Sequence, residues 1–142
     1  MTASNPTTDP GRVLALDFGK VRTGVAISDP SRTIVQPHEV VQKANSSDGL
    51  ASIAALVASF GVTRIVVGLP LGREGAESPQ AARSRSFAAR LAQHVGVPIE
   101  LHDERFTSKL ADRTVAETGS GASRDSLAAS HLLQSWMEAQ DR

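Results

Sequence analysis

Short apolar runs and longer stretches with helical spacing follow one another along the chain, and each predicts an element. The short runs predict five strands, at residues 13–16, 25–27, 33–42, 64–69 and 99–102. The first two strands are joined by a turn that contains Gly19 and Gly24, as in a hairpin. Pro37 restricts the third strand to an edge or a bulge, because proline has no amide hydrogen to donate to a neighbouring strand.

Apolar residues three and four positions apart predict helices between and after these strands. The capping residues 45–48 open the first helix, and a serine–proline pair opens the second. The four predicted helices run from Leu50 to Phe60, from Pro79 to Gly96, from a cap at Thr107 or Ser108 to Gly119, and from about Arg124 to Gln140.

The order of these elements predicts a mixed sheet. Alternating helices and strands imply parallel strands joined by right-handed crossovers, whereas the first three strands imply an antiparallel meander. We therefore expect an α/β fold, with a mixed five-stranded sheet flanked by helices. Residues 11–142 would form this single domain, and the polar, proline-containing residues 1–10 would form a flexible tail.

Composition excludes several classes of protein. The 142 residues include no cysteine, which excludes disulfides, thiolate metal sites and cysteine nucleophiles. No apolar run reaches the roughly 18 residues that span a bilayer, and residues 1–10 lack the features of a signal peptide, so a soluble cytoplasmic protein is expected. The 15 basic and 15 acidic residues balance to +0, which counts against a protein that coats duplex nucleic acid but allows a local basic patch.

Acidic residues stand where ligands gather in α/β sheets. Asp17 ends the first strand, and Asp103 and Glu104 end the last, so parallel strands would bring them to one edge. Asp125 leads the apolar stripe of the last helix. Each acid also has an ordinary explanation, since Asp17 can hydrogen-bond the turn after it and Asp125 can complement the helix dipole.

Converging carboxylates raise one another's pKa unless a cation joins them. In a chain without cysteine or a close histidine pair, hard oxygen ligands favour Mg²⁺ or Mn²⁺. A pair of such ions can stabilise both the attacking water and the leaving oxygen of a phosphodiester. The acids together therefore predict a metal site suited to phosphodiester hydrolysis.

Four stretches of the sequence carry a family resemblance: LALDFGKVRTGVAISD, IVVGLPLGREG, HDERFTS and DSLAASHLLQSWM. In order and spacing they resemble the signature blocks of the YqgF/RuvX family, whose members are ribonuclease H-like and related to Holliday junction resolvases. The resemblance covers nearly the whole chain after the first ten residues. It implies a ribonuclease H-like fold and a metal-dependent nuclease that processes the 5′ end of pre-16S rRNA in ribosome biogenesis. The alternative is a Holliday junction resolvase in DNA recombination and repair.

The resemblance also implies that Asp17, Glu104 and Asp125 are the catalytic acids and the ligands of Mg²⁺ or Mn²⁺. Asp103 is the alternative to Glu104, because strand alternation sends the two side chains to opposite faces and parity alone does not choose between them. Resolvases of the RuvC type carry an acid at the end of the fourth strand, where this sequence has Gly68-Leu69-Pro70. The resemblance to the YqgF group implies that in this chain the corresponding acid stands at the end of the fifth strand.

Substrate contacts are expected from residues close to these acids. Arg105 and Lys109 are candidates for holding a phosphate or restraining the carboxylates. Arg73 stands in a glycine-rich loop that either contacts substrate or is a solvated connector. Thr107 could bond substrate, although capping a helix also explains it. Gly19 would let the backbone turn tightly beneath a substrate phosphate.

Three further polar residues are explained without a role in function. Arg83 and Arg90 lie seven positions apart on one helix face, which is more typical of a solvated face than of a track for a nucleic-acid backbone. His131, six residues after Asp125, is better explained as a surface or half-buried histidine than as a general base.

Two other functions fit parts of the pattern. The acid, the glycine turn and the strand after it also resemble the phosphate-1 segment of actin-like ATPases, but these need two lobes to clamp ATP, and 142 residues barely make one. A catalytically silent nucleic-acid-binding domain would not need acids at all three places. The expected partner is a nucleic acid and not a membrane. The sequence leaves open a monomer or a homodimer, although cutting a junction would ask for two symmetric sites.

Overall fold

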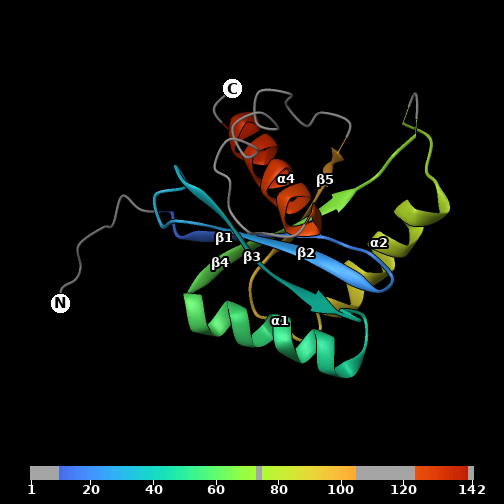
Figure 1. The fold of residues 1–142 in the computed structure, drawn as a ribbon, viewed down its shortest axis with the longest axis horizontal. Coiled ribbons are helices and arrows are strands. Elements are labelled where there is room, and N and C mark those ends of the chain that lie inside the picture. The colour runs from blue at the N-terminus through green and yellow to red at the C-terminus, as the bar shows by residue number, and fades with distance from the viewer. Residues whose placement is uncertain (1–9, 73–74, 105–123, 141–142) are drawn as a thin grey trace.

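Five strands form one mixed sheet in the computed structural model of the chain, which describes residues 10–72, 75–104 and 124–140 (Figure 1). The strands are β1 (Arg12–Asp17), β2 (Arg22–Ser28), β3 (Val35–Gln42), β4 (Val62–Leu69) and β5 (Ile99–Asp103). The helices are α1 (Ser47–Phe60), α2 (Pro79–Leu91) and α4 (Arg124–Gln140). All five predicted strands and three predicted helices are thus present, although α2 ends at Leu91 and not at the predicted Gly96. The remaining predicted helix, from Thr107 or Ser108 to Gly119, lies outside the described residues, as do residues 1–9 of the expected tail.

The strand directions bring the carboxyl ends of β1 and β5 to one edge. The order across the sheet is β3-β2-β1-β4-β5. The first three strands pair antiparallel, whereas β4 pairs parallel with both β1 and β5. The mixed sheet predicted from the order of elements is therefore confirmed. Pro37 lies on β3 at the sheet edge, where a strand without one amide hydrogen is tolerated.

Both faces of the sheet are covered, and alternate residues of β1 belong to different faces. Leu14 and Leu16 pack in the cluster that includes residues of α1 and α2. Val13 and Ala15 pack in a second cluster with α4, where Trp136 is 2% exposed. Figure 1 shows the same arrangement, with α4 on one side of the sheet and α1 and α2 on the other. Burial on both faces explains why β1 reads as a continuous apolar run.

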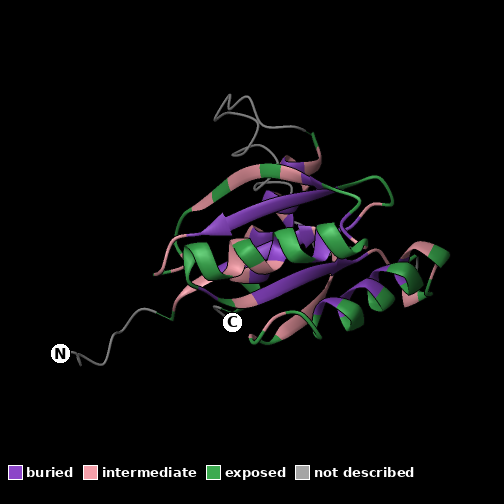
Figure 2. Cartoon of the chain, turned by 90° about the horizontal axis from the view of Figure 1, so that it is seen from below, coloured by how far each residue is buried: buried purple, intermediate pink, exposed green. Residues whose placement is uncertain are grey.

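The predicted helix caps are present. The Ser46 hydroxyl accepts a hydrogen bond from the Gly49 amide at the start of α1, and Gly61 closes that helix in the left-handed conformation. Ser78 caps α2 in the same way, with Pro79 as its first residue. Figure 2 shows that the outward faces of these helices are exposed, while the central strands of the sheet are buried. Of the helices in the described ranges, none has the length and apolar character needed to cross a membrane.

The third strand begins at Val35, two residues later than predicted, because Asp29 binds the backbone before it. Its Oδ1 accepts hydrogen bonds from the amides of Thr33 and Ile34, both at 2.7 Å. These amides are thereby withdrawn from strand pairing. Hydrogen bonds to the carboxylate, the Ser31 hydroxyl first among them, hold the pKa of Asp29 well below its usual range.

The first turn of α4 packs closely against Gly24, which lies within β2 and not in the preceding turn. A Cβ placed on Gly24 would lie 1.8 Å from the backbone oxygen of Asp125, in the first turn of α4. Gly24 is also the pairing partner of Asp17 across β1 and β2. The absence of a side chain at this position therefore lets α4 begin directly over the end of β1.

Replacing Gly24 by alanine should separate α4 from the sheet. Because the obstructing atom is backbone, the new methyl cannot be accommodated by a side-chain rotation, and we expect the free energy of unfolding to fall by about 1–3 kcal/mol. Urea unfolding followed by circular dichroism measures this change. Gly96→Ala is the matched control, since a Cβ there meets no atom within 4 Å. Equal unfolding midpoints for Gly24→Ala and the parent would contradict this packing.

Candidate active site

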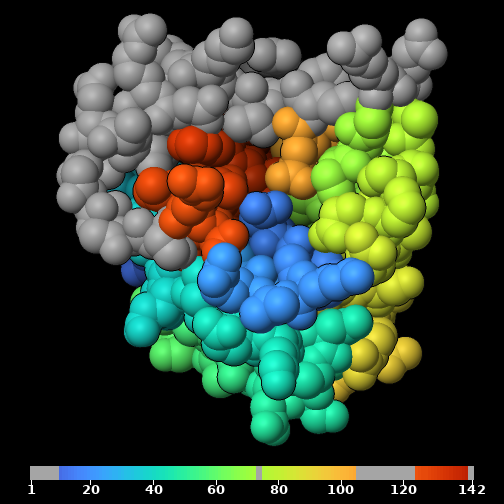
Figure 3. Space-filling view, turned by 45° about the vertical axis from the view of Figure 1, so that its right-hand side comes forward, coloured from blue at the N-terminus to red at the C-terminus, as the bar shows by residue number. Residues whose placement is uncertain are grey.

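Asp17 is the last residue of β1 and lies on the side of the sheet that α4 covers. Val13 and Ala15, on alternate positions before it, pack in the cluster with α4, so strand alternation gives Asp17 the same face. In Figure 3 the turn after β1 (blue) forms the centre of the surface, between α4 (red-orange) and α2 (yellow-green). The end of β5 (orange) lies next to this turn, as the parallel strands require.

Glu104 reaches Asp17 from the end of β5. The two carboxyl groups share a hydrogen bond. The side chain of Glu104 crosses the neighbouring strand at Gly68, where a Cβ would lie 2.8 Å from the Glu104 Cδ. The missing side chain on β4 is therefore what gives an acid from β5 its path to β1.

The structure distinguishes Glu104 from its neighbour Asp103. The Nε2 atom of His102 lies 3.0 Å from the Ser135 Oγ of α4, which fixes the face of the sheet that His102 occupies. Glu104, two residues later, lies on this same side, whereas alternation gives Asp103 the opposite face. Of the two acids at the end of β5, it is Glu104 that the fold brings to Asp17.

Asp125 lies in the first turn of α4, where its carboxylate pairs with Arg22. The Nε atom of Arg22 donates to Oδ2 of Asp125 at 2.9 Å, and the Asp125 side chain is 34% exposed. The charge of Asp125 raises the pKa of Asp17, which places it electrostatically within the same site. Sequence reasoning did not single out Arg22. In the sequence Arg22 is a basic residue of the predicted turn, and its partner is 103 positions away.

Burial and mutual repulsion determine how Asp17 and Glu104 are protonated. Burial raises the pKa of Glu104 to about 8, and the charge of Asp17 acts in the same direction. Burial also raises the pKa of Asp17, while the hydrogen bond from Glu104 opposes that rise. Glu104 therefore holds the shared proton near neutral pH and donates it to the Asp17 carboxylate. A single proton reconciles two acids that would otherwise repel each other.

The donor set fits a hard divalent cation. All the converging atoms are carboxylate oxygens, which Mg²⁺ and Mn²⁺ prefer, and a cation could replace the proton between Asp17 and Glu104. Within the described ranges, no three His, Cys, Asp or Glu side chains are already arranged as ligands of one ion. Asp125 pairs instead with Arg22. For all three acids to bind one ion, Asp125 would have to share its carboxylate between the ion and Arg22 or give up its contact with Arg22.

The other predicted substrate contacts divide into two groups. Gly19 lies in the turn after β1, where its amide donates to the Thr23 Oγ1 at 3.4 Å. Arg73, Arg105, Thr107 and Lys109 lie outside the described residues, and their roles stay predictions. His131, which was expected to be a surface or half-buried histidine, is half-buried on α4.

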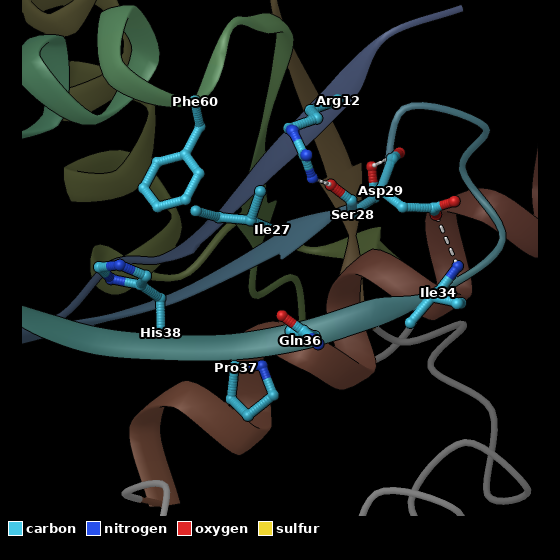
Figure 4. A pocket seen from close by; sticks show the side chains of 9 residues that line it. All are labelled: Arg12, Ile27, Ser28, Asp29, Ile34, Gln36, Pro37, His38 and Phe60. Carbon is cyan, nitrogen blue, oxygen red and sulfur yellow. Dashed lines mark hydrogen bonds between the residues drawn. The ribbon is translucent and has the colours of Figure 1, made fainter. Parts of the chain in front are cut away.

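A pocket at the opposite end of the sheet is not part of this site. It has a volume of about 200 Å³ and lies beside Arg12, the first residue of β1, and Phe60, the last of α1 (Figure 4). The ring of Phe60 meets that of His38 edge-on, with their centroids 5.6 Å apart. Arg12 donates to the Ser28 carbonyl, and Asp29 binds its own loop. The charged groups around this pocket are therefore occupied within the protein.

Comparison with known proteins gives matches along almost the whole chain. The family model for RuvX, Holliday junction resolvase, matches residues 11–139. The chain is 38% identical over 133 residues to the "Putative pre-16S rRNA nuclease" of Myxococcus xanthus (strain DK1622), covering 90% of this chain and 88% of the relative. It is 42% identical over 108 residues to the protein of the same name from Anaplasma marginale (strain St. Maries), covering 76% of this chain and 69% of the relative.

Solved structures show the fold. Thermus thermophilus RuvC matches with a TM-score of 0.62 at 13% identity, covering 92% of this chain and 96% of that chain. RuvC of T. thermophilus in complex with a Holliday junction substrate matches with a TM-score of 0.60 at 15% identity, covering 92% and 95% of the two chains. The predicted ribonuclease H-like fold is confirmed.

The raised pKa of Glu104 should make stability depend on pH. The folded protein holds this proton up to about pH 8, whereas the unfolded chain releases it near the ordinary value of 4.5. The proton's stabilisation is therefore complete below that ordinary value and is lost as the pH rises toward 8. Without divalent cations, the free energy of unfolding of the parent relative to Glu104→Gln should fall across this window. Urea titrations at several pH values in EDTA measure it, and a constant difference would contradict the shared proton.

Replacing Gly68 by alanine should move Glu104 away from Asp17. The new Cβ would stand 2.8 Å from the Glu104 Cδ, and a flexible side chain yields more readily than the strand. We expect the pKa of Glu104, followed by carbon NMR of its carboxyl group, to fall from about 8 toward its ordinary value. Gly72→Ala is the control, because its nearest contact would be an ordinary one at 3.5 Å. An unchanged Glu104 titration in Gly68→Ala would show that Gly68 does not set its position.

Proposed function

Since this chain belongs to the RuvX (Holliday junction resolvase) family, we propose that it is a divalent-metal-dependent nuclease that hydrolyses a phosphodiester bond of pre-16S rRNA. One observation carries the proposal: the hydrogen-bonded pair of Asp17 and Glu104, with Asp125 beside it, at the carboxyl edge of the sheet. In α/β sheets that edge is where ligands bind. The pair is costly to bury without a cation or a proton, which supports a catalytic interpretation over a structural one.

In this proposal Asp17, Glu104 and Asp125 hold Mg²⁺ or Mn²⁺. The bound cation would supply Lewis-acid polarisation of a phosphoryl oxygen and a more acidic water molecule. Glu104 loses its proton to become a ligand, and Gly68 leaves room for its side chain beside Asp17. Arg22 holds Asp125 at the edge of the site until it is exchanged for a cation. Arg105, Lys109, Arg73 and Thr107, with the Gly19 turn, are the proposed contacts to the substrate.

RNA is the proposed substrate because the relatives from Myxococcus xanthus and Anaplasma marginale carry the name of a pre-16S rRNA nuclease. Processing of ribosomal RNA would place the protein in the cytoplasm. A four-way DNA junction is the second candidate, supported by the family model's description and by the fold shared with RuvC bound to such a junction. Symmetric cutting of a junction would require a homodimer with two sites, whereas an RNA end can be cut by one.

A cleavage panel tests this function. The parent, with Mg²⁺ or Mn²⁺, should cut a pre-16S rRNA fragment that carries its 5′ extension, and EDTA should abolish the cut. Asp17→Asn, Glu104→Gln and Asp125→Asn should each lower the rate by about 100-fold or more, because each removes a charged metal ligand. A four-way DNA junction in the same panel separates the two candidate substrates.

Glu100→Gln is the matched control for the three acid variants. Glu100 lies on β5, the strand that leads to Glu104, and its carboxylate pairs with Arg64 at 3.4 Å. The cleavage rate of Glu100→Gln should stay within about twofold of that of the parent, because a surface ion pair contributes little to stability. The nuclease proposal fails if the parent cuts neither substrate, or if the three acid variants cut as fast as Glu100→Gln does.

A further inference from the structure

An open groove lies beyond the carboxyl end of β1, between the turn after that strand and the first half of α2. Its volume is about 320 Å³, and it is lined by Phe18, Lys20, Asn45, Ala82, Arg83 and Ser86. Two of these lining residues are cationic and none is acidic. Figure 3 shows the two walls next to each other, with the turn in blue and α2 in yellow-green.

One wall of the groove is joined directly to the strand that carries Asp17. Phe18, the next residue, stacks on Phe87 of α2 with their ring centroids 4.4 Å apart and their planes at 15°. The carbonyl of Phe18 also accepts a hydrogen bond from Gln80 Nε2 at 2.9 Å. The groove is therefore held in a fixed relation to the candidate active site by an aromatic pair and a hydrogen bond.

Gln80 also orients Arg83 at the opposite wall. The Nε atom of Arg83 donates to Gln80 Oε1 at 3.1 Å, so one amide group links this arginine to the backbone beside Asp17. Arg90, on the same helix face, has a different role. Its Nη1 donates to the carbonyl and to the side-chain oxygen of Asn45, at 2.6 and 2.9 Å. Arg90 thus ties the loop before α1 to α2, while Arg83 faces the groove.

The cations of the groove are not neutralised within the described ranges. Neither Lys20 nor Arg83 has a carboxylate at ion-pair distance there, whereas Arg22, Arg64 and Arg85 each pair with an acid. An exposed ammonium and an oriented guanidinium are both donors that bind phosphate oxygens. Between them, Phe18 and Ala82 offer apolar atoms that suit a sugar or a base.

We propose that this groove binds the phosphodiester backbone of the substrate strand next to the bond that is cut, with Lys20 and Arg83 as its phosphate contacts. This inference rests on the proposed nuclease function and extends its site to α2. The cations of the groove give it a charge opposite to that of the phosphodiester backbone. The groove would recognise the phosphates of a nucleic-acid strand, which RNA and DNA have in common.

Binding without cleavage tests the groove. Fluorescence anisotropy in EDTA measures the Kd of a labelled pre-16S rRNA fragment and of a labelled four-way DNA junction at several salt concentrations. Lys20→Ala and Arg83→Ala should each raise Kd about fivefold or more and lower the slope of log Kd against log salt by about 1, because each removes one phosphate contact. The double variant should lower the slope by about 2. The nucleic acid that shows the larger losses is the one that occupies the groove.

Arg85→Ala is the matched control, since Arg85 lies on the same helix and pairs with Glu77 at 2.7 Å. It removes an equal charge and should leave Kd and the salt slope close to those of the parent. Unfolding midpoints of all variants should match, because the altered side chains are exposed.

The outcomes separate the groove from the proposed function. If the parent binds but Lys20→Ala and Arg83→Ala bind as tightly as Arg85→Ala, with the same salt slope, the groove proposal is wrong and the nuclease proposal stands. If these two variants lose affinity as expected but the parent cuts nothing with Mg²⁺ or Mn²⁺, the groove stands and the nuclease proposal is wrong. A parent that neither binds nor cuts either nucleic acid overturns both.

Discussion

The contact between α4 and β2 at Gly24 is the constraint on which the candidate site depends. A Cβ at this position would lie 1.8 Å from the backbone of Asp125, so no other residue allows the helix to start where it does. Gly24 pairs with Asp17 across the hairpin, and the helix therefore begins directly over the strand that ends in an acid. The same packing buries Trp136 and the apolar stripe of α4 on that face of the sheet. One contact thus packs α4 against the sheet and brings the charge of Asp125 to Asp17.

A second glycine decides which acid meets Asp17. Gly68 leaves a gap on β4, the strand between β1 and β5, and Glu104 extends across it. A carboxylate from the fifth strand can in this way occupy the region above the fourth. The two carboxyl groups then lie close enough to share a hydrogen bond and one proton. At neutral pH one proton separates the two carboxyl groups, and a divalent cation could take the place of that proton.

Cationic side chains around the site differ by what they contact and not by their charge. Arg22 pairs with Asp125, and Arg90 binds the loop before α1 through Asn45. Arg83 is oriented by Gln80 toward an open groove, near Lys20. The chain has a net charge of +0, so a substrate strand must be attracted by a local arrangement and not by the overall charge. The sequence alone could not show which of these four cationic residues are held by partners within the protein and which face the groove.

The sequence by itself determined the elements and their order. Apolar runs, capping residues such as Ser46 and Ser78, and the edge position of Pro37 depend on neighbours within a few residues, which the sequence displays directly. The family resemblance carried the choice of acids, because strand alternation gave Asp103 and Glu104 opposite faces without showing which face holds the site. Only the tertiary structure decided that Glu104 crosses Gly68 and that Asp125 pairs with Arg22, 103 positions away. Local spacing cannot encode such contacts, because they exist only once the strands and α4 have packed.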